Sequence, residues 1–171
     1  MGTSMQDKPE DIPETIETLR KALFGEELKH VIQPSKYNRE GKVTGQLVGG
    51  NIAILASMLG SDSQILTNGK ILFIEEIGEY KYSIDRMLQS LKRAGYFTKV
   101  KGVIVGDMTK VKKNTTPWGS SIEQLILDVL PNDIPVLFNF PAGHEPDNRA
   151  LIMGRNVELA VGSKQSTVVF K

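Results

Sequence analysis

The fold is decided by the stretch Gly69-Lys70-Ile71-Leu72-Phe73-Ile74-Glu75-Glu76-Ile77-Gly78-Glu79. Four consecutive apolar residues follow a glycine and run directly into two carboxylates, which is the pattern of a strand buried on both faces. Ligands and catalytic groups gather at the carboxyl ends of such strands in open α/β sheets. We therefore expect Glu75 and Glu76 to lie at a functional edge of a sheet. The simpler alternative is that they mark the point where the strand reaches water.

Length and charge limit the classes of partner that the chain can have. With 171 residues, the chain is long enough for one domain with its own core. The net charge is +1, from 21 Lys and Arg against 20 Asp and Glu. Nucleic acids and anionic membranes usually select a strong basic excess, and no apolar run approaches the ~20 residues that span a bilayer. The sequence thus predicts neither a nucleic acid nor a membrane partner.

The chain has no cysteine. This excludes disulfides, thiolate nucleophiles and thiolate metal sites, and it fits a reducing compartment. Residues 1–17 are expected to be a leader or linker, partly disordered, with a short amphipathic helix that starts at Pro13. Two methionines four residues apart, Met1 and Met5, suggest that the chain is a piece of a longer protein.

Helices and strands alternate through the rest of the chain. Apolar spacing, caps and glycine stops predict helices over 13–24, 52–59, 83–94 (with Ser83 as N-cap) and from Ser121 onward, and strands over 30–32, 43–48, 71–74, 101–106, 134–140, 156–161 and 166–170. This order predicts a single α/β domain over residues 18–171, with a mixed sheet or half-barrel and flanking helices. The polar loop 107–119, which holds Trp118, is long enough to be functional.

A second sequence feature joins the strand over 43–48 to the helix over 52–59. Gly49, Gly50 and Asn51 stand between the two. Free backbone N–H groups at a helix N-terminus can bind an anion or an oxyanion. We therefore assign Gly49, Gly50, Asn51 and the nearby Glu76 to the vicinity of a substrate or oxyanion. A purely structural Gly-Gly turn is the alternative, because the pattern is neither a dinucleotide fingerprint nor a Walker loop.

Two histidines, His30 and His144, are the candidates for a general base. His30 lies in a segment of mixed character, and we expect it at the surface or at a sheet edge. His144 follows a buried strand through Pro141 and Gly143, which bend the chain sharply. If the strands that end at Glu75 and His144 lie side by side, the carboxylate can orient the imidazole, as in the acid and base of a hydrolytic triad.

The nucleophile and a metal are harder to find in the sequence. No serine has a Gly-x-Ser-x-Gly elbow or a comparable sharp turn. A metal site could use His144, Glu145 and Asp147, but one histidine at this spacing does not match the patterns of zinc sites. We predict no metal and no cofactor.

Four motifs in order resemble one known family. They are Gly49-Gly50-Asn51 at a helix start, the stretch 69–79, Ile84-Asp85-Arg86-Met87-Leu88 and Gly143-His144. Together they resemble the C-terminal domain of the LD-carboxypeptidases, the muramoyltetrapeptide carboxypeptidases, whose relatives include the microcin immunity peptidases. The resemblance covers residues 18–171 and implies a domain of the swivelling β/β/α type.

The resemblance also implies a function. It implies a cytoplasmic, metal-independent and commonly dimeric serine peptidase with a Ser-His-Glu triad, in which Glu75 and His144 match the family's glutamate and histidine. The family's serine belongs to an N-terminal domain, which is expected as the partner of this chain. The implied substrate is a murein tetrapeptide, cleaved between a diamino acid and terminal D-alanine in peptidoglycan recycling, and the chain alone is expected to be inactive.

Two other hypotheses remain open. In one, the chain is a non-catalytic binding or dimerisation module in which Glu75 and His144 pair only for structure. In the other, it belongs to an immunity-type peptidase that acts on an acyl-nucleotide peptide, with Trp118 in the loop 107–119 as an aromatic platform.

Overall fold

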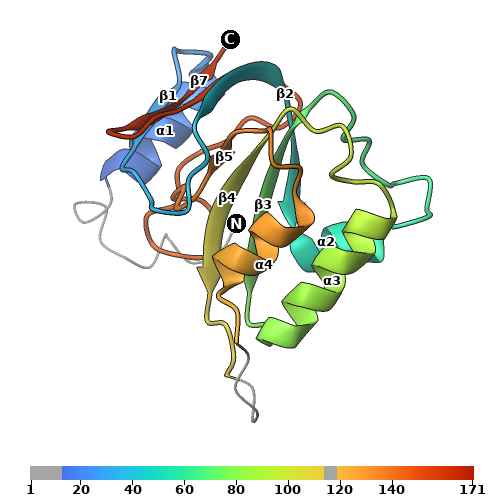
Figure 1. The fold of residues 1–171 in the computed structure, drawn as a ribbon. Coiled ribbons are helices and arrows are strands. Elements are labelled where there is room, and N and C mark those ends of the chain that lie inside the picture. The colour runs from blue at the N-terminus through green and yellow to red at the C-terminus, as the bar shows by residue number, and fades with distance from the viewer. Residues whose placement is uncertain (1–12, 114–118) are drawn as a thin grey trace.

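The computed structural model describes residues 13–113 and 119–171 (Figure 1). The elements, in chain order, are α1 (Pro13–Phe24), β1 (Lys29–Ile32), β2 (Gly41–Asn51), α2 (Ile52–Ser57), β3 (Ile71–Ile77), α3 (Lys81–Arg93), β4 (Gly102–Thr109), α4 (Ile122–Val129), β5 (Val136–Leu137), β6 (Asn156–Val161) and β7 (Ser166–Phe170). None of these helices is both long and apolar enough to cross a membrane.

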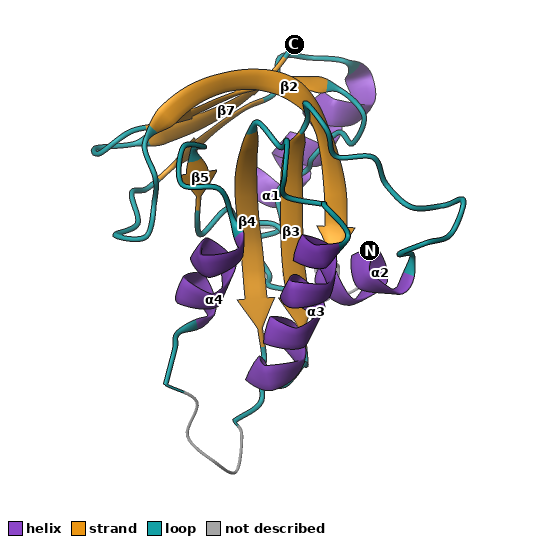
Figure 2. Ribbon diagram, turned by 45° about the vertical axis from the view of Figure 1, so that its right-hand side comes forward, coloured by secondary structure: helices purple, strands orange, loops and turns teal. Residues whose placement is uncertain are grey.

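Seven strands form one mixed sheet in the order β1-β7-β6-β2-β3-β4-β5. The strands β2, β3, β4 and β5 are parallel to their neighbours, whereas β1, β7, β6 and β2 pair antiparallel. The long strand β2 belongs to both parts, because Gly41–Gln46 pair with β6 and Leu47–Asn51 pair with β3. Figure 2 shows β2 bending over the top of the molecule to make this change of partner. The predicted single α/β domain with a mixed sheet and flanking helices is confirmed.

Each face of the parallel part of the sheet carries its own core. On β3, Leu72 and Ile74 pack with α2, α3 and α4, whereas Ile71 and Phe73 pack on the opposite face with residues of β6 and β7. All four side chains are at most 5% exposed. The apolar run therefore forms the strand that it predicts, buried on both faces. Glu75 and Glu76 lie in the last three residues of β3, at the edge of the sheet where this strand ends.

Residues 13–17, which the expected domain boundary gives to the linker, are the first turns of α1. Thr15 is the buried residue of this helix. Residues 1–12 and Trp118 lie outside the described residues.

Two predicted elements have different limits in the structure. The prediction that α3 starts after Ser83 is wrong: the helix begins at Lys81, because the Ser83 N–H already donates to the carbonyl of Tyr80 and closes the first turn. The predicted strand 134–140 shrinks to β5, because Asn139 has a positive φ of 62° and turns the chain out of the ladder. The buried side chains of Phe138 and Phe140 explain why the run looked like a strand.

Other limits shift less. Strand β2 continues through Gly49, Gly50 and Asn51, which the prediction placed between the strand and the helix, and β4 extends into the predicted loop as far as Thr109. Helix α2 ends at Ser57, earlier than the prediction.

Of the two positions expected for His30, the sheet edge is found and the surface is not. His30 lies on the edge strand β1, but it is only 2% exposed. Its ring packs edge-on against Phe140 and Phe170, and its Nε2 hydrogen-bonds the carbonyl of Ala150 at 3.0 Å. Burial is the main cause that lowers the pKa of His30 to about 4. His30 is therefore a neutral core residue.

The first prediction concerns Gly49, which lets β2 approach β3. Its φ is +132°, and a Cβ there would lie 1.9 Å from the carbonyl oxygen of Phe73. We expect Gly49→Ala to lower the free energy of unfolding by more than about 3 kcal/mol in urea denaturation, since the clash adds to backbone strain of about 1–3 kcal/mol. Gly50→Ala is the control, because its φ is +152° but nothing lies within 4 Å. Equal losses in both variants would contradict this reading.

The second prediction concerns pH. Because the pKa of His30 is lower in the folded chain than in the unfolded chain, the unfolded chain binds the additional proton as pH falls. The contribution to stability is complete above pH ~6.5 and is lost between ~6.5 and ~4, by about 3 kcal/mol for a shift of this size. Between pH ~6.5 and ~4, the free energy of unfolding, measured by chemical unfolding, should fall less steeply with pH for His30→Gln than for wild type. An equally steep fall in both proteins would exclude His30 as the cause of the loss of stability.

Candidate active site

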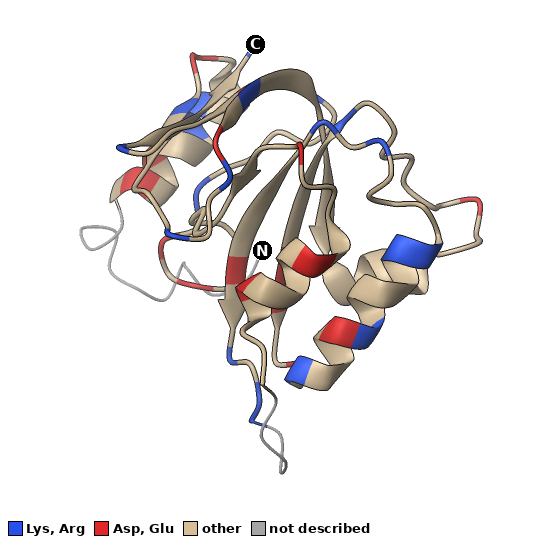
Figure 3. Cartoon of the chain, viewed as in Figure 1, with Lys and Arg blue, Asp and Glu red and all other residues tan. Residues whose placement is uncertain are grey.

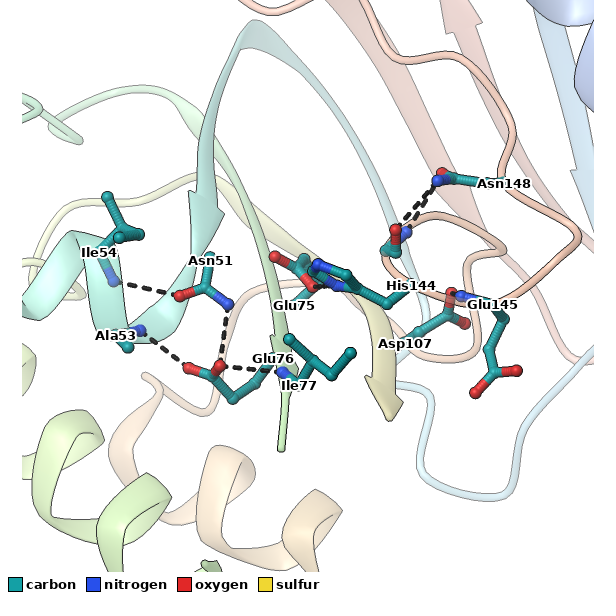
Figure 4. Close-up of polar contacts among 11 residues, drawn as sticks. Asn51, Ala53, Ile54, Glu75, Glu76, Ile77, Asp107, His144, Glu145 and Asn148 are labelled. Atoms are coloured by element: carbon teal, nitrogen blue, oxygen red, sulfur yellow. Dashed lines mark hydrogen bonds and ion pairs between the residues drawn. The ribbon is translucent and has the colours of Figure 1, made fainter. Parts of the chain in front are cut away.

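Glu75 and His144 are brought together. The Nδ1 atom of His144 lies 2.9 Å from Oε2 of Glu75, as Figure 4 shows. The Glu75 side chain is 9% exposed, and that of His144 is 42% exposed. A carboxylate can only accept, so the Nδ1–H donates, and Nε2 remains as the nitrogen that can take a proton. The structure therefore pairs a buried carboxylate with a partly exposed imidazole.

The two residues do not come from neighbouring strands. Strand β4 lies between β3 and β5, so the condition of side-by-side strands is not met. The loop after β5 reaches Glu75 by crossing β4 at Gly106. A Cβ at Gly106 would lie 2.3 Å from the carbonyl oxygen of Ala142 and 2.8 Å from the ring of Phe73. The missing side chain is therefore what makes the crossing possible.

The backbone on both sides of His144 is held by polar contacts (Figure 4). Asn148 clamps Gly143: its Oδ1 accepts from the Gly143 N–H at 3.3 Å, and its Nδ2 donates to the Gly143 carbonyl at 2.9 Å. On the other side of His144, the Glu145 N–H donates to Oδ2 of Asp107 at 3.4 Å. The Asp107 N–H in turn donates to the carbonyl of Ala142 at 2.9 Å. These contacts fix the turn that carries the imidazole.

Asp107 lies in acidic surroundings. Burial raises the pKa of the Asp107 carboxyl, the hydrogen bond from Glu145 opposes this, and the negative charges of Glu145, Asp147 and Glu75 raise the pKa further. Figure 3 shows acidic positions at the carboxyl ends of the central strands, and further acidic and basic positions on the helices, the loops and the outer part of the sheet. The acidic character of this edge is therefore local, since the whole chain carries a net charge of +1.

Glu76 points to the other side of the strand and holds the start of α2. It is 2% exposed and accepts from the Asn51 side chain at 2.8 Å, from the Ala53 N–H at 2.8 Å and from the Ile77 N–H at 2.9 Å. Asn51 caps the same helix by accepting from the Ile54 N–H at 3.1 Å. Two N–H groups of α2 thus bond groups of the chain itself. The substrate or oxyanion role of Gly49, Gly50, Asn51 and Glu76 stays a prediction.

The alternative metal set is not gathered. Within 13–113 and 119–171, no three His, Asp or Glu side chains come close enough together to hold a metal ion. The Asp147 carboxylate instead pairs with the guanidinium of Arg149 at 2.9 Å.

The sequence predicts Glu75 and His144 but not the residues that place them. Gly106, Asp107 and Asn148 carry no motif of their own. A weak signal exists for two of them, because Gly106-Asp107 ends a buried run, as Glu75-Glu76 does. Asn148 could be recognised only once the loop was folded.

Comparisons with known proteins show which family the chain is similar to. Residues 44–159 match a family described as the LD-carboxypeptidase C-terminal domain. The probable murein peptide carboxypeptidase of Bacillus subtilis is 36% identical over 75% of this chain and 40% of its own length. The microcin C7 self-immunity protein MccF of Escherichia coli is 34% identical over 71% of this chain and 35% of its own.

A solved structure extends the likeness to the fold. The muramoyltetrapeptide carboxypeptidase from Oxalobacter formigenes superposes with a TM-score of 0.78 at 25% identity, over 92% of this chain and 54% of the other. The chain spans about two fifths of the length of the Bacillus subtilis relative. The family match covers well over half of the chain, so the chain belongs to the LD-carboxypeptidase C-terminal domain family.

Proposed function

We propose that this chain supplies the acid and the base of a serine LD-carboxypeptidase. The observation that carries the proposal is the 2.9 Å hydrogen bond between His144 Nδ1 and Glu75 Oε2, which leaves Nε2 accessible. His144 takes the proton of a serine hydroxyl as the serine oxygen attacks the scissile carbonyl, and then gives that proton to the leaving amine. Glu75 orients the ring and stabilises the imidazolium.

The serine belongs, in this proposal, to an N-terminal domain that pairs with this chain. The substrate is a murein tetrapeptide, cut between the diamino acid and terminal D-alanine, and the enzyme acts in the cytoplasm in peptidoglycan recycling, as a homodimer. The names of the Bacillus subtilis relative and the Oxalobacter formigenes structure support the choice of substrate.

An immunity-type peptidase is the second candidate, and the 34% identity to the microcin C7 self-immunity protein favours it. The two candidates use the same acid and base and differ in what binds beside them. Assays of the two-domain protein with a murein tetrapeptide and with an aminoacyl-nucleotide conjugate, each over a concentration series, would rank the two substrates by kcat/KM.

The third prediction is that the chain needs the serine-bearing domain. Without a nucleophile, the Glu75–His144 pair has nothing to activate, so the chain alone should release no D-alanine from a murein tetrapeptide. Addition of the separately prepared N-terminal domain should restore release, measured with a D-amino acid oxidase assay. Turnover by the chain alone would be evidence against the proposed division of the triad.

The fourth prediction separates catalysis from structure at Glu75. In the two-domain protein, Glu75→Gln should lower kcat by about 10⁴-fold, the effect expected when a triad carboxylate becomes an amide, with little change in the melting temperature. Glu40→Gln is the matched control, since Glu40 is an exposed carboxylate that is distant in sequence from Glu75 and His144. If Glu75→Gln instead lowers stability and spares kcat, the pair is structural and the chain is a binding or dimerisation module.

A further inference from the structure

Helix α1 contacts the segment that follows His144. The Thr15 hydroxyl accepts from the Asn148 N–H at 2.9 Å and donates to the carbonyl of Pro146 at 3.4 Å. The Thr18 hydroxyl accepts from the Ala150 N–H at 3.1 Å. In addition, the Arg149 guanidinium forms an ion pair with Glu14 at the start of the helix. The N-terminal helix thus holds a segment more than 120 residues away in sequence.

The spacing of the two threonines on α1 matches the spacing of the two N–H groups that they bind. Thr15 and Thr18 lie one turn apart on the same face of α1, and they bind the N–H groups of alternate residues, Asn148 and Ala150. In extended backbone, alternate N–H groups point to the same side. The Arg149 N–H between them donates to the carbonyl of Pro141 at 2.8 Å. The segment is therefore held from both sides, by α1 and by the chain that leaves β5.

A continuous path of contacts leads from α1 to the imidazole. The backbone of Asn148 is held by Thr15, and the side chain of Asn148 clamps Gly143 through two hydrogen bonds. Gly143 directly precedes His144, whose ring meets Glu75. Thr15 is 9% exposed, so its hydroxyl has little water to replace the amide if the contact is lost.

We propose that Thr15 is a positioning residue for His144: its hydroxyl holds Asn148, Asn148 holds Gly143, and Gly143 sets the imidazole against Glu75. The residue lies outside the 44–159 family match. The catalytic meaning of this contact rests on the proposed function, but its effect on the imidazole is measurable without turnover.

The fifth prediction tests this path by NMR on the chain with ¹⁵N-labelled histidine. In the wild type, the Nδ1–H of His144 should be observed with slow solvent exchange, because Glu75 accepts it. Thr15→Val keeps the shape of the side chain and removes the hydroxyl. We expect the exchange rates of the Asn148 amide and of the His144 Nδ1–H both to rise, by on the order of tenfold, the factor that corresponds to one lost hydrogen bond.

Two further variants serve as controls. Thr15→Ser retains the hydroxyl and should restore slow exchange at both sites. Thr167→Val makes the same chemical change on β7, and it should leave His144 unaffected. If Thr15→Val prevents folding, Asn148→Ala removes the Gly143 clamp and should release the His144 Nδ1–H in the same way.

The proposal is overturned if the Asn148 amide exchanges faster in Thr15→Val while the His144 Nδ1–H does not. In that case Thr15 only stabilises the segment. In the two-domain protein, Thr15→Val should lower kcat more than it raises KM. If the wild-type two-domain protein releases no D-alanine, but Thr15→Val still speeds exchange of the His144 Nδ1–H, the proposed function fails and the positioning role stands.

Discussion

The hydrogen bond between Glu75 and His144 depends on the absence of a side chain at Gly106 of β4. Glu75 lies near the end of β3 and His144 follows β5, and the side chains of β4 between them would keep the two apart. Gly106 removes the side chain at the crossing point, where the ring of Phe73 and the carbonyl of Ala142 fill the space. The contact that defines the candidate active site is therefore made possible by a residue that takes no part in chemistry.

The two adjacent glutamates show how one strand end serves two purposes. Because successive side chains of a strand point to opposite faces, Glu75 faces the loop of His144 and Glu76 faces the start of α2. Three donors satisfy Glu76, a sufficient reason for a carboxylate to be buried. The pairing of Asn51 with Glu75 in the β2–β3 register then fixes α2 beside the candidate site.

Sequence reasoning recovers the features that are local. The apolar run before Glu75 predicts a strand buried on both faces, and the turn residues before His144 predict a sharp exit from the sheet. It misses features that depend on the tertiary fold. The positive φ of Asn139 shortens β5 although the neighbouring residues are apolar. Nothing in the sequence around Gly106 indicates that a loop passes over it. For His30 a signal was present, since the two-residue period places it on the same face as the buried Ile32.

The contacts of α1 also determine when the site can form. Helix α1 leaves the ribosome more than a hundred residues before Asn148 and Ala150, whose amides donate to its threonines. A helix of twelve residues is marginal by itself in water, so these hydroxyls stay on a marginally stable element until residues 146–150 have been synthesised. The imidazole can therefore align against Glu75 only after α1 has docked on residues 146–150.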